Sequence, residues 1–170
     1  MPANSELLVA LAIAGAGGAG ALVDLRTRRV PNPLTMGIAV MGVSLAAARL
    51  SGLSVTDALL GFAVGFVFML PGFLIGATGG GDVKLFAALG TLLGPRSIGF
   101  AFLYAVIAGG LLAVAVAVQR RRLYETLNNA AALVMTRGGN VAEIEDVSQN
   151  NRFPYAPAIA LGALVAAIAR

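Results

Sequence analysis

Long stretches without a charged residue alternate with short charged segments along the chain. Six such stretches occupy residues Leu7–Val23, Val30–Ala48, Ala58–Gly81, Leu85–Pro95, Ser97–Gln119 and Phe153–Ala169. A helix needs about 20 apolar residues, within a range of about 17–25, to cross a bilayer. Five of the stretches meet this requirement and the fourth is short. The pattern predicts an all-α membrane protein with a bundle of six transmembrane helices, and 170 residues favour a single domain, residues 1–170.

The positive charges predict the orientation of these helices. With the N-terminus outside, nine basic residues lie in the inner segments, namely Arg26, Arg28, Arg29, Lys84, Arg120, Arg121, Arg122, Arg137 and Arg152. Only Arg49, Arg96 and Arg170 lie in the outer segments. Cytoplasmic loops of membrane proteins carry the excess of Lys and Arg. We therefore expect both termini outside, and the first apolar stretch to be a retained helix, since no basic residue precedes it.

One long connection, residues 119–152, separates the last two apolar stretches. Within it, Leu123, Leu127, Ala130 and Val134 recur at helical spacing beside a run of arginines. This pattern is typical of an amphipathic helix at the cytoplasmic interface. A flexible cytoplasmic loop is the alternative.

Glycines recur at a spacing of four within the third stretch, as Gly61 with Gly65 and as Gly72 with Gly76. The first stretch is also rich in glycine. Small residues at this spacing let helices approach closely in lipid. We expect these glycines to serve helix packing.

Composition limits the chemistry. The chain is 58% hydrophobic and 12% charged, with a mean hydropathy of +0.87, as in a membrane protein. Its net charge of +4 is divided between the apolar stretches and forms no continuous basic face, so we expect no nucleic-acid partner. The chain has no His and no Cys, which excludes Ser-His-Asp and Cys-His catalysis and the usual metal sites. We therefore expect no metal and no cofactor.

Two of the eight acidic residues stand out as candidates for proton chemistry. Glu6 and Asp57 fall at outer helix ends, where a carboxylate favours the helix dipole, and four others lie in the 119–152 connection. Asp24 and Asp82 remain, both at predicted inner helix ends. Each also has an ordinary interpretation: Asp24 could pair with Arg28, and Asp82 could cap the fourth helix. Ionisable residues at the membrane are functional candidates by default.

The sequence around Asp82 favours a functional role for this residue. The segment Asp82–Gly94 spans only about 20 Å as a helix, against about 30 Å for the hydrocarbon core. Asp82 is then expected in a shallow recess. The irregular backbone expected at Gly79, Gly80 and Gly81 is a candidate notch for a substrate backbone. Lys84 is either an interfacial anchor or a group that holds a substrate carboxylate or tunes an aspartate.

These residues resemble the type IV prepilin peptidases, polytopic aspartic proteases of the bacterial inner membrane. "GGGDVKL", Gly79 to Leu85, resembles their GxGD motif, and "DLRTRRVPN", Asp24 to Asn32, resembles their first aspartate motif. "FPYAPAIALGAL", Phe153 to Leu164, is similar to their last helix. The chain lacks the cysteine-rich loop and methyltransferase portion of the large members. It therefore resembles the short CpaA- and TadV-like branch that serves tight-adherence (Flp-type) pili, and methylation is not expected.

The resemblance implies that Asp24 and Asp82 are the catalytic pair of a peptidase that cuts pilin precursors at the cytoplasmic membrane face, commonly after a glycine. Two neighbouring carboxyl groups share one proton, so the pair can activate water and polarise the scissile carbonyl. Which aspartate holds the proton stays open, as does self-association. The alternatives are a small proton-coupled transporter and a non-catalytic membrane subunit of pilus assembly.

Overall fold

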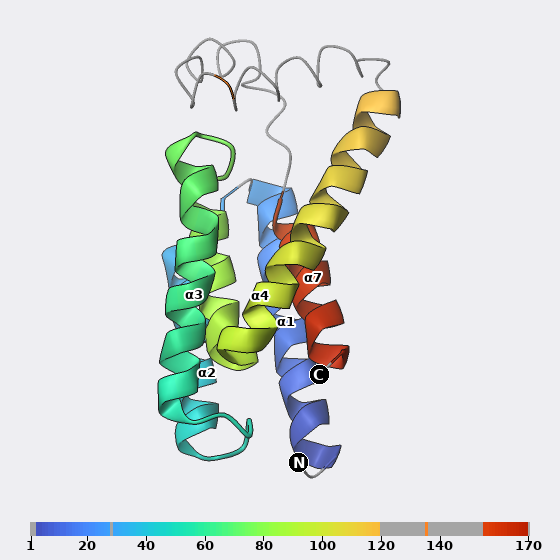
Figure 1. Cartoon of the computed structure of the whole chain (residues 1–170). Helices are drawn as coiled ribbons and strands as arrows, with labels where there is room; N and C mark the ends of the chain where they lie inside the picture. Colours follow the sequence, from blue (N-terminus) through green and yellow to red (C-terminus); the bar gives the residue numbers. More distant parts are fainter. Residues whose placement is uncertain (1–2, 28, 120–134, 136–154, 170) are drawn as a thin grey trace.

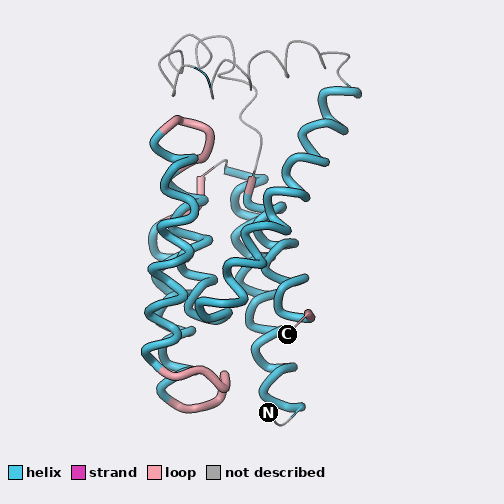
Figure 2. Tube along the Cα trace, viewed as in Figure 1, coloured by secondary structure: helices cyan, strands magenta, loops and turns pink. Residues whose placement is uncertain are grey.

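Helices make up the regular structure of the part of the chain that the structure describes. The computed structural model describes residues 3–27, 29–119, 135 and 155–169 (Figure 1). It contains α1 (Ala3–Thr27), α2 (Asn32–Ala47), α3 (Val55–Leu74), α4 (Gly80–Gln119) and α7 (Ala156–Ile168). In Figure 2 short turns join α2 to α3 and α3 to α4, and no strand occurs within these described residues. The predicted all-α class is confirmed, whereas the predicted amphipathic helix lies outside the described residues.

Three of these helices are long and apolar enough to cross a membrane. They are α1 over Leu7–Thr27, α3 over Val55–Leu74 and α4 over Gly80–Ala115. The other two, α2 and α7, are shorter apolar helices. The chain is therefore a helical membrane protein, and the number of spans and their orientation stay predictions.

Helix α4 consists of two helices joined by a sharp break at Gly94. The backbone of this glycine has φ 74° and ψ 173°, a conformation that residues other than glycine rarely adopt. The following Pro95 cannot donate a backbone hydrogen bond but suits the first position of a new helix. In Figure 1, α4 descends from the α3 turn and rises again beyond the break. The break falls in the short fourth apolar stretch, next to its end at Pro95.

The first half of α4 is the centre of the bundle. Its side chains from Leu85 to Leu93 are buried without interruption, and Phe86 has no exposed surface. A helix buried on every side is apolar around its whole circumference, as this segment is. An aromatic cluster holds both halves of α4 to α3: the ring of Phe102 lies 5.3 Å from that of Phe68 and 6.0 Å from that of Phe86.

Glycines set the closest helix contacts. A Cβ on Gly61 of α3 would collide with the carbonyl oxygen of Gly90 in α4. A Cβ on Gly65 would lie 3.1 Å from the carbonyl oxygen of Phe86. The packing role predicted for this first glycine pair is confirmed.

The second glycine pair of the third apolar stretch is not a helix-packing pair, and that prediction is wrong, because Gly76 lies beyond the end of α3 at Leu74. The atoms nearest to a Cβ on Gly72 belong to Thr78 of the following turn, at 3.1 Å and beyond. Gly76 lies in that turn with φ 73°. These glycines therefore shape the α3–α4 turn, because positive φ is a conformation that glycine adopts without strain.

Candidate active site

Helices α1 and α4 meet at a glycine just below the two candidate aspartates. A Cβ on Gly20 would lie 2.8 Å from Leu85 Cδ2, so the two helices are in direct contact there. Asp24 follows Gly20 by one turn and Asp82 precedes Leu85 by about one turn, offsets of roughly 6 and 4.5 Å. Since α1 and the first half of α4 run in opposite directions (Figure 1), these offsets bring both aspartates to the same end of the bundle.

The two carboxyl groups interact. The negative charge of Asp24 acts on the Asp82 carboxylate. Asp24 is buried, with 7% of its surface exposed, and Asp82 is half-buried. Two carboxylates in a partly dry site repel strongly, so the pair is stabilised when one member carries a proton.

Each aspartate also accepts a hydrogen bond from the start of a helix. The backbone N–H of Ala156, the first residue of α7, donates to the Asp24 carboxylate. The backbone N–H of Gly79 donates to Asp82 Oδ2 at 3.2 Å, at the start of α4. Asp82 therefore caps the start of α4, which is the ordinary role that the sequence suggested for it. This role is compatible with catalysis, because a helix N-terminus favours the ionised form that activates water. Arg28, the predicted partner of Asp24, lies outside the described residues.

The irregular backbone expected at the three glycines before Asp82 is found only at Gly79, and the expectation is wrong for Gly80 and Gly81. Gly80 and Gly81 belong to the first turn of α4, and Gly79 immediately precedes it. None of the three has a positive φ. Gly81 instead allows close packing, because a Cβ there would lie 3.2 Å from Val30 Cβ. Whether these glycines bind a substrate backbone stays a prediction.

Lys84 joins α4 to the start of α2. Its exposed side chain donates a hydrogen bond from Nζ to Asn32 Oδ1 at 3.0 Å. The two residues line the polar edge of a groove of about 600 Å³ whose other walls include Met36 and Phe66. This link between residues far apart in the sequence was not predicted, and it adds a structural role to the two roles considered for Lys84.

Tyr155 and Ala156 are the site residues that sequence reasoning missed. Ala156 contacts Asp24 through its backbone, and the negative charge of Asp82 acts on the phenol of Tyr155. A backbone donor leaves no signal in residue type. For Tyr155 a signal did exist, since a chain without His and Cys has few side chains able to exchange protons and this tyrosine lies at the start of the last helix.

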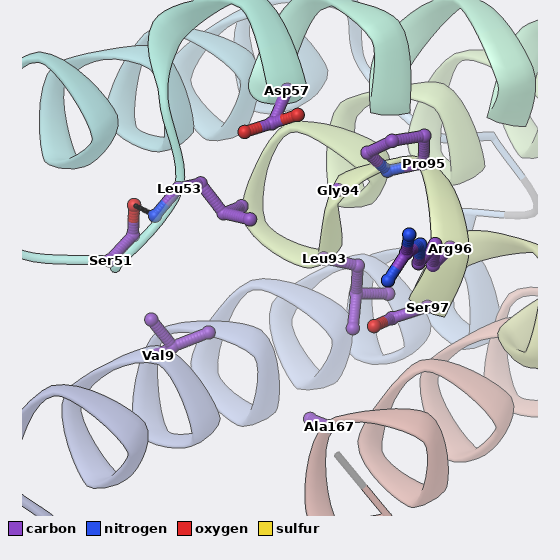
Figure 3. A pocket seen from close by; sticks show the side chains of 10 residues that line it. All are labelled: Val9, Ser51, Leu53, Asp57, Leu93, Gly94, Pro95, Arg96, Ser97 and Ala167. Carbon is purple, nitrogen blue, oxygen red and sulfur yellow. Dashed lines mark hydrogen bonds between the residues drawn. The ribbon is translucent and has the colours of Figure 1, made fainter. Parts of the chain in front are cut away.

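The opposite end of the bundle holds a recess lined by charged residues (Figure 3). This cavity of about 470 Å³ opens beside the break in α4 and is lined by Gly94, Arg96, Asp57 and residues of the α2–α3 connection. Asp57 caps α3: its Oδ2 accepts from the Ser54 N–H at 3.2 Å, and its own N–H donates to Ser54 Oγ at 3.0 Å. The helix-end role predicted for Asp57 is confirmed, and this acid is remote from Asp24 and Asp82.

Within the described part of the chain, no three or more acidic side chains gather as a metal-binding group. The described arrangement is therefore an all-helical membrane protein with two interacting carboxyl groups at one end of its bundle, each tied to the start of a helix.

A family model for the type IV leader peptidase family matches residues 8–114, which include both aspartates, and the chain belongs to this family. It is similar to the prepilin leader peptidase/N-methyltransferase of Bacillus subtilis strain 168, with 33% identity over 152 residues, 86% of this chain and 49% of that protein. It is also 36% identical over 103 residues to a type 4 prepilin-like proteins leader peptide-processing enzyme of Escherichia coli O78:H11, covering 56% of this chain and 38% of that protein. The chain thus spans half or less of the length of these relatives. No solved structure matches it.

Proposed function

We propose that the chain is an aspartic endopeptidase of the bacterial inner membrane that removes the leader peptide from type IV pilin precursors of the Flp, or tight-adherence, type. The observation that carries the proposal is the placement of Asp24 and Asp82 at the same end of the bundle, on two helices that touch at Gly20 and Leu85 (Figure 1). Membership of the type IV leader peptidase family supports this assignment over the transporter and the assembly subunit.

The proposed topology has six spans, with α1, α2, α3, the two halves of α4, and α7 each crossing or entering the membrane. The break at Gly94 supports counting α4 twice. The excess of arginine and lysine in alternate segments supports an outside N-terminus. The aspartate end of the bundle then faces the cytoplasm, where the leader of a membrane-inserted precursor is accessible.

The proposed reaction is hydrolysis by a pair of carboxyl groups that share one proton. The ionised carboxylate takes a proton from a water molecule while the water oxygen attacks the scissile carbonyl carbon. The protonated carboxyl group donates its proton to the carbonyl oxygen. When the C–N bond breaks, the departing amine receives a proton from the pair. The pair titrates as a unit, so neither role is assigned to one aspartate.

The proposed substrate has a short basic leader followed by an apolar helix that stays in the bilayer. Cleavage at the boundary between these parts, after a glycine, places the scissile bond at the depth of Asp24 and Asp82. Gly79, Gly80, Gly81 and Lys84 border this position and are the proposed contacts for the substrate backbone and its polar groups.

The function is tested by incubating the purified chain in lipid vesicles with a recombinant pilin precursor that retains its leader and apolar helix. We expect one cut, located by mass spectrometry at the leader boundary. We also expect the same rate with and without EDTA, because a chain with no His and no Cys lacks the usual metal ligands. An intact precursor would contradict the proposal, and proton flux across the vesicle membrane would favour the transporter.

A further inference from the structure

A groove between α2 and α3 opens on the surface of the bundle. Both helices pack closely against α4 and only slightly against each other, so the first half of α4 forms the floor of the groove. The walls of this groove of about 600 Å³ include Met36 and Val40 of α2 with Phe62 and Phe66 of α3. All four side chains are exposed. The walls therefore suit an apolar segment that lies within the bilayer.

The groove begins at the aspartate end of the bundle. Its polar edge is the hydrogen bond of 3.0 Å from Lys84 Nζ to Asn32 Oδ1, which joins the starts of α4 and α2. From Asn32 the wall follows α2 for two turns to Val40, a distance of about 12 Å along the helix. Because Lys84 comes two residues after Asp82, the groove runs from the level of the aspartates toward the middle of the bundle.

Only the start of α4 separates this groove from the two aspartates. A step of two residues is a rotation of about 200° around a helix, so Asp82 and Lys84 leave α4 on opposite sides. The helix start before Asp82 consists of Gly79, Gly80 and Gly81, which have no side chains, and Gly79 is exposed. An extended chain that passes from one side to the other meets no side chain of these three residues.

We propose that this groove binds the first two turns of the apolar helix of the pilin precursor, and that the residues joining this helix to the scissile bond cross the start of α4 in extended form. The inference rests on the proposed function and names the surface that holds its substrate. A helix is about 10 Å across, so the crossing takes about three extended residues. The groove then contacts the precursor within about the first dozen residues that follow the cut.

The polar edge of the groove suits the extended part of the precursor. Backbone carbonyl groups that leave a helix within a membrane need hydrogen-bond donors. Lys84 has three N–H donors and gives one to Asn32, so two remain for such carbonyl groups. A second groove, of about 490 Å³ between the second half of α4 and α7, has no charged residue among those that line it. This second groove provides the comparison for both tests.

The first test is photo-cross-linking with a benzophenone-bearing residue placed at Val40 or at Leu111, each in the Asp82→Asn variant so that the precursor stays uncut. Leu111 lines the second groove and is 67% exposed, against 63% for Val40. We expect the probe at Val40 to form an adduct within about the first dozen residues after the leader boundary, and the probe at Leu111 to form none. Adducts of Val40 with lipid alone, or precursor adducts from Leu111 instead, would overturn the proposal.

The second test compares Val40→Trp with Leu111→Trp in the vesicle cleavage assay. Tryptophan at Val40 fills the groove, so we expect KM for the precursor to rise by about tenfold while kcat changes by less than about twofold; Leu111→Trp should change neither. With a short peptide that spans the leader boundary but ends before the apolar helix, the difference between the variants should disappear. An unchanged KM for Val40→Trp would overturn the inference. An intact precursor with the unaltered chain would contradict the proposed function, whereas cleavage without a Val40 adduct would overturn the inference alone.

Discussion

Asp24→Asn and Asp82→Asn each reduce cleavage of the pilin precursor by about 10²–10⁴-fold, the usual contribution of a general acid or base. Asparagine keeps the shape of the side chain but can neither take a proton from water nor give one to the carbonyl oxygen. Because one member of the pair must be ionised and the other protonated, the single carboxyl group left in either variant cannot supply both roles. The rate is measured with purified variants in lipid vesicles.

Asp57→Asn is the matched control for these variants. Asp57 is also a carboxylate in the first turn of a helix, but it caps α3 beside the recess at the opposite end of the bundle. We expect this variant to cleave the precursor within about twofold of the unaltered rate, because asparagine keeps a side-chain oxygen that can accept from the Ser54 N–H and the residue lies far from Asp24 and Asp82. Full cleavage by Asp24→Asn or by Asp82→Asn would refute the catalytic pair.

Gly61→Ala destabilises the folded bundle by about 1–3 kcal/mol, the usual range for extra atoms forced into a packed contact. The added methyl group would collide with the carbonyl oxygen of Gly90 and lie 2.9 Å from Gly94 Cα, so α3 must move away from the first half of α4 and from the break at its end. The first half of α4 carries Asp82, so we expect activity to fall together with stability. Thermal unfolding in detergent measures the first effect.

Gly15→Ala provides the comparison for Gly61→Ala. Gly15 also lies within an apolar helix, but a Cβ there would meet nothing within 4 Å. Alanine lowers the conformational entropy of the unfolded chain, so we expect unchanged or slightly higher stability. Equal effects of the two substitutions would show that the α3–α4 contact does not depend on glycine.

The sequence predicts the helical segments well where charges mark their ends. The stretch Val30–Ala48 corresponds to α2 and Phe153–Ala169 to α7. The helix ends are predicted less well where the turn that follows contains no charged residue. The stretch Ala58–Gly81 runs past the end of α3 at Leu74, because the turn that follows uses glycine conformations rather than charge to reverse the chain.

Elimination by composition finds the two candidate aspartates because so few groups can exchange protons in this chain. Composition cannot identify groups whose role depends only on where the fold places them. The donor to Asp24 is a backbone N–H on α7, and the partner of Lys84 is an asparagine 52 residues away. The regular helix at Gly80 and Gly81 was mispredicted for a related reason: glycine permits an irregular backbone but does not require one, and here Gly81 is needed for the approach of Val30.

Catalysis by an aspartate pair requires Asp24 and Asp82 to lie close together, and thiol cross-linking measures this proximity. The chain contains no cysteine, so Asp24→Cys combined with Asp82→Cys introduces the only two thiols. We expect a short bifunctional thiol reagent to link them in nearly every molecule, as mass spectrometry of the digested protein will show. Asp57→Cys combined with Asp82→Cys should give no link. Failure to link the first pair under conditions that modify both thiols would contradict the account.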